Sequence, residues 1–291
     1  MLKKSLLIMV SILFLASLYL HFGHNWEDKT PKSLNIPVLT PSPRRPTKVE
    51  RKKPLGDFQK EQLVESYLDS SGLWAQLGMP QKILNKHLEN PLMAKRLSMD
   101  DLEKVKQLIQ EKLGVDAISR QVKKQISNSF SPKELQDLLE IFSTPVMKKV
   151  ASLEEYLSSE DLLVKAGLMQ LTTEKSSQRA KLLAHLESIK SEGERSFLIT
   201  LHSIRGLHQG FARILPKEKR ISEKRVKATL AILNKFARPR FKNLALIRYD
   251  YAYKDLSNRE LREYISISQK KVMLKAQEAT LRGIIDSFKA L

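Results

Sequence analysis

The sequence predicts an all-α fold, a helical bundle that follows a single N-terminal transmembrane helix and a proline-rich linker. Leucine, lysine, glutamate and alanine are plentiful while valine is sparse, and this composition favours helix over strand. Beyond Phe58 the apolar residues recur at the spacing of one helix face, and no stretch shows sustained alternation bounded by turn dipeptides. The 291 residues can bury a sizeable core, so we expect packed helices and no sheet.

The first element is an apolar run of 17 residues from Leu6 to Phe22, the short end of the length that spans a membrane. We expect residues 1–23 to form an uncleaved signal anchor. A cleaved signal peptide is the alternative, with Leu15-Ala16-Ser17 as the nearest candidate cleavage site, and the chain would then be secreted. Lys3 and Lys4 precede the run, so the positive-inside rule predicts a single-pass inner-membrane protein whose bulk faces the periplasm.

Residues 24–57 are predicted to form a basic, proline-rich linker. Six of the twelve prolines lie between Pro31 and Pro54. Proline removes backbone donors and favours extended geometry, so this stretch cannot join a core and is typical of a semi-stiff spacer. Its arginines and lysines are also suited to contact anionic head groups or wall polymer.

The remaining chain is predicted to be helical from its apolar stripes and its caps. Two capping boxes are recognisable, Ser131-Pro132-Lys133-Glu134 and Ser257-Asn258-Arg259-Glu260. We divide this region into a first helical half, residues 58–160, and a more basic second half, residues 161–291. The apolar stripes are formed by Leu63, Val64, Tyr67 and Leu68; by Leu102, Val105, Leu108, Ile109 and Leu113; and by Val226, Leu230, Leu233 and Phe236.

The two capping boxes begin a longer internal similarity at an offset of 126 residues. Leu135 matches Leu261, and Val146-Met147 matches Val272-Met273. A second echo pairs Gly72-Leu73 with Gly167-Leu168. The pattern predicts two related halves, the second of them longer. Chance similarity between amphipathic helices is the alternative.

The segment from Phe130 to Lys149 carries a family resemblance. It reads Phe-Ser-Pro-Lys-Glu-Leu and then Phe-Ser-Thr-Pro-Val-Met-Lys-Lys. It resembles a helical domain of secreted and periplasmic bacterial proteins, labelled domain of unknown function twenty fifty-nine, most strongly over residues 58–150. The chain departs from that pattern at Thr144, which separates Ser143 from Pro145, and at Met147, where the family often has glycine. The resemblance implies an all-helical fold and an envelope location, and it brings no catalytic residues.

Several kinds of chemistry have no support in the sequence. There is no cysteine, and none of the six histidines has the spacing of a metal site. The spacing of Gly206 and Gly210 is interpreted as close helix packing. No nucleophile elbow, phosphate-binding loop or dinucleotide fingerprint is present. We therefore predict a protein that is not an enzyme, with no catalytic residues, cofactor or metal. The paired acids are interpreted as partners of helix dipoles near helix starts: Asp100-Asp101, Glu154-Glu155 and Glu160-Asp161.

Charge is distributed very unevenly. Residues 57–175 carry 16 basic and 18 acidic residues, whereas residues 176–291 carry 25 and 11. Between Arg205 and Arg248 lie thirteen basic residues and two acids. Such an excess attracts anionic polymers or membrane surfaces. Interleaved aromatics such as Phe236 are expected to pack inward. The candidate anion-binding residues, here called the basic stretch, are Arg213, Lys217, Arg220, Lys224, Arg225, Lys227, Arg238, Arg240 and Lys242.

Two functions are compatible with these features. The first is a non-enzymatic, membrane-tethered envelope protein that binds an anionic partner, which could be lipid, wall polymer or an acidic protein. The second is a helical protein that binds nucleic acid. No recognisable DNA- or RNA-binding motif is present, which favours the first.

Overall fold

The computed structural model describes residues 55–89, 97–157 and 177–291. The anchor predicted over residues 1–23, the linker predicted over residues 24–57 except its last three residues, and the Gly167-Leu168 echo lie outside these described residues. The last three linker residues already belong to the first described helix, which begins at Leu55. Within the described ranges, no helix is long and apolar enough to span a membrane.

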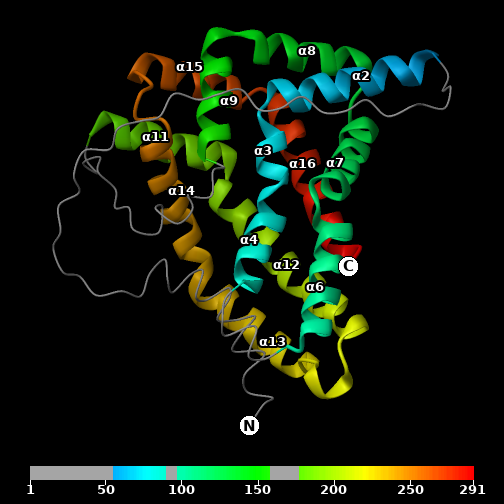
Figure 1. Cartoon of the computed structure of the whole chain (residues 1–291). Coiled ribbons are helices and arrows are strands. Elements are labelled where there is room, and N and C mark those ends of the chain that lie inside the picture. Colours follow the sequence, from blue (N-terminus) through cyan, green and yellow to red (C-terminus); the bar gives the residue numbers. More distant parts are fainter. Residues whose placement is uncertain (1–54, 90–96, 158–176) are drawn as a thin grey trace.

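The prediction of an all-α fold without a sheet is confirmed for the described residues, which contain helices and no strand (Figure 1). The first half contains α2 (Leu55–Ser70), α3 (Leu73–Leu77), α4 (Met79–Leu88), α6 (Met99–Leu113), α7 (Val115–Ser129), α8 (Pro132–Ser143) and α9 (Pro145–Leu157). The second half contains α11 (Gln178–Lys190), α12 (Glu192–Ile214), the 3₁₀ turn η1 (Lys217–Lys219), α13 (Glu223–Ile232), the π-helical turn η2 (Leu233–Ala237), α14 (Arg238–Ala252), α15 (Asn258–Ser268) and α16 (Lys271–Lys289).

Both predicted capping boxes are present. Ser131 begins α8, where its Oγ accepts from the Glu134 N–H at 3.3 Å while the Glu134 carboxylate accepts from the Ser131 N–H at 2.8 Å. Ser257 and Glu260 repeat this arrangement at the start of α15, with distances of 3.2 and 2.7 Å. Each box satisfies backbone donors that the first helical turn leaves without a partner, so each fixes where its helix begins.

The helices enclose one large and one small hydrophobic core. The large core takes side chains from both halves, and its central feature is the packing of α7 along α16 (Figure 1). The small core lies between α12, α13 and α14, where Phe197 and Phe241 meet edge to face with ring centroids 5.5 Å apart. Figure 1 places α13 at the opposite end of the molecule from α2, α8 and α15.

Glycines allow two helix crossings to be unusually close. A Cβ on Gly283 of α16 would lie 2.5 Å from the Cα of Val122 on α7. A Cβ on Gly206 of α12 would lie 2.1 Å from the carbonyl oxygen of Phe288 on α16. Real Cβ atoms do not approach backbone this closely. The prediction that the Gly206–Gly210 spacing marks close helix packing is therefore confirmed, since Gly210 also faces Leu108.

The two halves arrange their helices in corresponding ways. In the first half α2 packs against α7 and α8, and in the second half α11 packs against α14 and α15. The helix that follows each capped helix, α9 after α8 and α16 after α15, packs against the other half. Helix α9 contacts α15, and α16 contacts α8.

Two ion pairs repeat this exchange at the level of single residues. Lys149 of α9 places its Nζ 2.9 Å from Oε1 of Glu260, in the second capping box. Lys275 of α16 forms the matching pair with Glu134, in the first capping box. Each lysine and each glutamate lies 126 residues from its counterpart. The two ion pairs therefore correspond to each other like equivalent contacts in a two-fold symmetric dimer, where residue i of one subunit contacts residue j of the other and the reverse.

Candidate functional site

The basic stretch follows a bent but nearly continuous course through the second half. Arg213 lies in the last turn of α12, Lys217 lies in η1 and Arg220 follows it. The remaining six residues lie on α13 and on the start of α14, and η2 joins these two helices without a break. All nine are exposed except Arg225, which is half-buried. The structure therefore places the predicted residues along one end of the molecule and its flank.

Part of this charge is used within the protein. Arg213 donates to the backbone oxygen of Leu291, and Arg220 donates to that of Leu215. Lys227 pairs with Glu223 one turn away. Arg238 makes a two-pronged contact with Glu194, with distances of 2.8 Å from Nε and 2.6 Å from the terminal nitrogen.

Other members of the basic stretch have no partner among the described residues that neutralises their charge. Lys217, Lys224 and Lys242 are exposed, and within the described ranges they form no ion pair. Exposed ion pairs add little to stability, so the paired residue Lys227 can also be redirected to a ligand at low cost.

The prediction that the interleaved aromatics pack inward holds for some of them and fails for one. Phe241 is buried, and Phe211 packs against the large core. The prediction is wrong for Phe236, which is 60% exposed.

The spacing of the buried residues accounts for the exposure of Phe236. Val226, Leu230, Leu233 and Ala237 face the small core at intervals of four, three and four residues, which is the ordinary period of one helix face, so Phe236 lies to one side of that face. The π-helical turn η2 lies in the same segment, where the Arg238 N–H bonds to the carbonyl oxygen of Leu233, five residues earlier. Pro239, just beyond η2, cannot donate a backbone hydrogen bond, which favours such a distortion.

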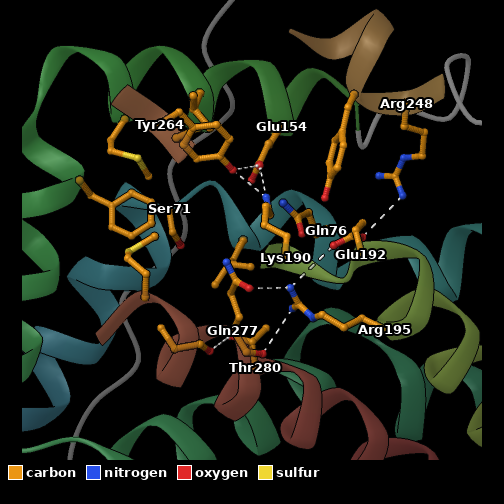
Figure 2. Close-up of a pocket in the computed structure, with 18 of the residues that line it drawn as sticks. Ser71, Gln76, Glu154, Lys190, Glu192, Arg195, Arg248, Tyr264, Gln277 and Thr280 are labelled. Atoms are coloured by element: carbon orange, nitrogen blue, oxygen red, sulfur yellow. Dashed lines mark hydrogen bonds and ion pairs between the residues drawn. The ribbon is translucent and has the colours of Figure 1, made fainter. Parts of the chain in front are cut away.

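A second candidate site is a cavity of about 140 Å³ between the halves. Figure 2 shows its charged side chains, which converge from several helices. Lys190 is the last residue of α11, Glu192 and Arg195 lie in the first turn of α12, and Arg248 comes from α14. Apolar and aromatic side chains from α2, α9 and α16 complete the lining.

The centre of this cavity wall is a buried network around Glu154. Oε1 of Glu154 accepts from Lys190 Nζ at 2.7 Å and from the Tyr264 hydroxyl at 2.9 Å (Figure 2). It also accepts from the Tyr253 hydroxyl at 2.6 Å. Lys190 also donates to Tyr264 at 2.7 Å. The interpretation of Glu154 as a partner of a helix start is wrong, because it lies in the last turn of α9 and faces inward. Asp101, in contrast, does lie in the first turn of its helix, as predicted.

The pKa values in this network lie far from neutrality. Burial disfavours the charged form of Glu154, but the Lys190 ammonium and three hydrogen bonds outweigh that effect and hold the pKa of Glu154 at about 2. Burial would lower the pKa of Lys190, yet Glu154 holds it well above its usual range. Burial, reinforced by Glu154, raises the pKa of Tyr264 to about 12. General acid–base catalysis near neutral pH requires a pKa near that pH, so this network is suited to joining helices rather than to moving protons.

The other side of the cavity is held by Arg195. Its guanidinium donates to the side-chain and backbone oxygens of Gln277 at 3.4 and 3.3 Å. It also lies 3.7 Å from Glu192, which in turn is 3.8 Å from Arg248. These contacts connect α12 to α14 and α16 within the second half.

The sequence did contain a signal for this network. Glu154 follows Val150 by four residues and therefore falls within the apolar stripe of α9. Lys190 follows Leu186 by the same interval on α11. A charge within an apolar stripe indicates a buried partner, because an isolated buried charge is very costly. Nothing in the spacing of the two residues identifies them as partners.

Among the described residues, no cluster of histidine, aspartate and glutamate could hold a metal ion. No protein-family model, no curated protein and no solved structure matches the chain. The resemblance over residues 58–150 to the domain of unknown function twenty fifty-nine stays a prediction.

Proposed function

We propose that this chain is a non-enzymatic, membrane-tethered envelope protein that binds an anionic partner through the basic stretch. The observation that carries the proposal is the set of exposed basic residues from η1 to α14, of which Lys217, Lys224 and Lys242 have no ion pair within the described ranges. The tether is the span expected over residues 1–23.

The proposal also includes two related halves. It is supported by the shared capping boxes, by the corresponding helix order and by the reciprocal ion pairs Lys149–Glu260 and Lys275–Glu134. In this view the second half differs from the first chiefly by its charge, because its α12–α14 region carries the basic stretch. The added charge would then be a specialisation of one half.

Binding to anionic polymers tests the function directly. The full-length chain is held in phosphatidylcholine nanodiscs, so that its expected anchor is occupied, and its retention on heparin is measured as salt rises. Attraction between exposed charges is screened by salt, so retention should fall steeply through the physiological range. Reversing Lys217, Lys224 and Lys242 to glutamate should abolish retention, because the change removes three positive charges and adds three negative ones.

The matched control reverses three exposed lysines of the first half, Lys124→Glu, Lys133→Glu and Lys148→Glu. It makes the same change in net charge on α7, α8 and α9, so it should retain most binding. Equal loss in both triple variants would show that net charge alone matters and would refute a localised surface. Retention that ignores salt would refute an electrostatic partner altogether.

A further inference from the structure

Two large apolar side chains interrupt the basic stretch. Ile232 is 54% exposed and Phe236 is 60% exposed, and they lie four residues apart where α13 passes into η2. The other large apolar side chains that are exposed in the described part of the chain are single residues on separate helices, namely Phe58, Met99 and Leu274. Exposed apolar groups next to each other commonly mark an interaction site, whereas scattered ones do not.

The fold does not use these two side chains. The small core beneath them is filled by Val226, Leu230 and Leu233, together with Ala237 one turn further on. These residues hold α13 against α12, and they leave the opposite face open. Ala228 and Ala231, which are small, are also exposed in this segment.

Basic side chains surround the apolar pair. Lys224 and Lys227 lie before it on α13, and Arg238 and Arg240 lie after it on α14, all exposed. Lys235 lies between the two, with its Nζ 5.2 Å from the centre of the Phe236 ring. We call this surface the docking face, defined as the exposed residues of the range 224–240.

We infer that the docking face binds the surface of an anionic phospholipid bilayer, with Ile232 and Phe236 entering the boundary between head groups and acyl chains. The basic side chains around them would contact lipid phosphates. This inference rests on the proposed function and names its partner. A helix with an apolar strip between cations is the arrangement that lies in the plane of a membrane interface.

Charge and apolar exposure together favour lipid over wall polymer and nucleic acid. A wall polymer or nucleic acid would engage the lysines and arginines but would offer no apolar layer for Ile232. A bilayer satisfies both features, since anionic head groups attract each nearby cation and the acyl boundary removes apolar surface from water. The span expected over residues 1–23 would hold the docking face near such a surface and raise its local concentration.

The test uses the absence of cysteine from the sequence. In the full-length chain, Ala231→Cys is labelled with an environment-sensitive fluorophore, and the chain is held in phosphatidylcholine nanodiscs. Mixed phosphatidylcholine–phosphatidylglycerol vesicles should then shift the emission to the blue, and pure phosphatidylcholine vesicles should not. A label at Ser266→Cys on α15, at the other end of the molecule, should stay in water with both kinds of vesicle.

Apolar insertion is tested by the double variant Ile232→Ser and Phe236→Ser. It should lower affinity for the mixed vesicles about tenfold or more, since both side chains lose their apolar burial. Its heparin retention should not change, because no charge is altered. The control Phe58→Ser with Leu274→Ser removes one aromatic and one aliphatic side chain, 38% and 40% exposed, from α2 and α16. It should bind mixed vesicles and heparin like the parent.

The outcomes separate the two proposals. If the double serine variant binds mixed vesicles like the parent and the label at position 231 stays in water, insertion is refuted while the anionic surface stands. If neither vesicles nor heparin is bound, the proposed function fails and the inference fails with it. Binding to heparin or DNA without binding to mixed vesicles would overturn the choice of lipid.

Discussion

Glu154 and Lys190 form an ion pair in a mostly buried position, where either charge without its partner would be strongly destabilising. Their terminal atoms are 2.7 Å apart, and their side chains are 21% and 10% exposed. The two tyrosine hydroxyls that complete the network come from α15 and from the end of α14. The pair therefore fixes the end of α9 against three elements of the second half, and its value lies in this positioning more than in net stabilisation.

Breaking that pair should be costly. Lys190→Met leaves Glu154 buried without its cation, and we expect the free energy of unfolding to fall by about 3–5 kcal/mol. Adding Glu154→Gln should recover a large part of the loss, because the uncompensated charge is then removed. Lys149→Met, which breaks a more exposed pair, should cost about 0–1 kcal/mol. Denaturant unfolding measures all three, and a Lys190→Met protein as stable as the parent would contradict the account.

The Glu154 carboxylate should make the free energy of unfolding depend on pH. The pKa of Glu154 is lowered from 4.5 to about 2 in the folded protein, so the unfolded chain binds the proton more readily between these values. Stability from this group is present above about pH 5 and is lost as pH falls toward 2, by about 3 kcal/mol in total.

Thermal unfolding followed from pH 6 to pH 2 should therefore show a smaller decline for Glu154→Gln than for the parent. Some decline should persist, because contacts with lysine and with capping groups also hold the pKa values of Glu134 and Glu260 at about 2. Identical slopes for variant and parent would show that Glu154 is not ionised against Lys190 as described.

At the scale of elements, the stability that each capping box contributes can be compared between the two halves. Ser131→Ala and Ser257→Ala each remove one cap while keeping the helix, and each should cost about 1 kcal/mol. Because both boxes sit at the same kind of crossing, with a lysine from the other half on the capping glutamate, the two costs should agree closely. A large cost at one box with none at the other, measured by denaturant unfolding, would argue against corresponding roles.

Elements that depend on neighbouring residues could be predicted from the sequence, and contacts between distant elements could not. The boxes at Ser131 and Ser257 follow from four adjacent residues, and the core positions of α2 and α6 follow from helical spacing. The sequence alone misplaces Phe236 because the smaller apolar residue Ala237 takes the next core position of the α13 stripe. The pairing of Glu154 with Lys190 joins residues 36 apart on helices whose packing the sequence does not specify. The basic stretch could be found from the sequence alone, but the exposure of Ile232 and Phe236 within it could be found only from the structure.

At the scale of the whole molecule, two membrane contacts of different strength are proposed, the span over residues 1–23 and the docking face. They should respond differently to salt. Attraction between surface charges and head groups weakens as salt is added, whereas burial of an apolar run does not. Together they would keep the helical body close to one bilayer.

Extraction of cell membranes separates the two contacts. The full-length chain should sediment with membranes and stay there in high salt and in alkaline carbonate, because the proposed anchor would place the 17-residue run from Leu6 to Phe22 in the acyl layer. Placing arginine in its middle, as Leu13→Arg with Leu15→Arg, should cost about 2.5–3.5 kcal/mol for each residue at the centre of a span. That variant should remain on membranes only at low salt, through the docking face. The triple variant at Lys217, Lys224 and Lys242 should still resist carbonate. A mature protein that begins near Leu18 would instead show a cleaved signal peptide and refute the anchor.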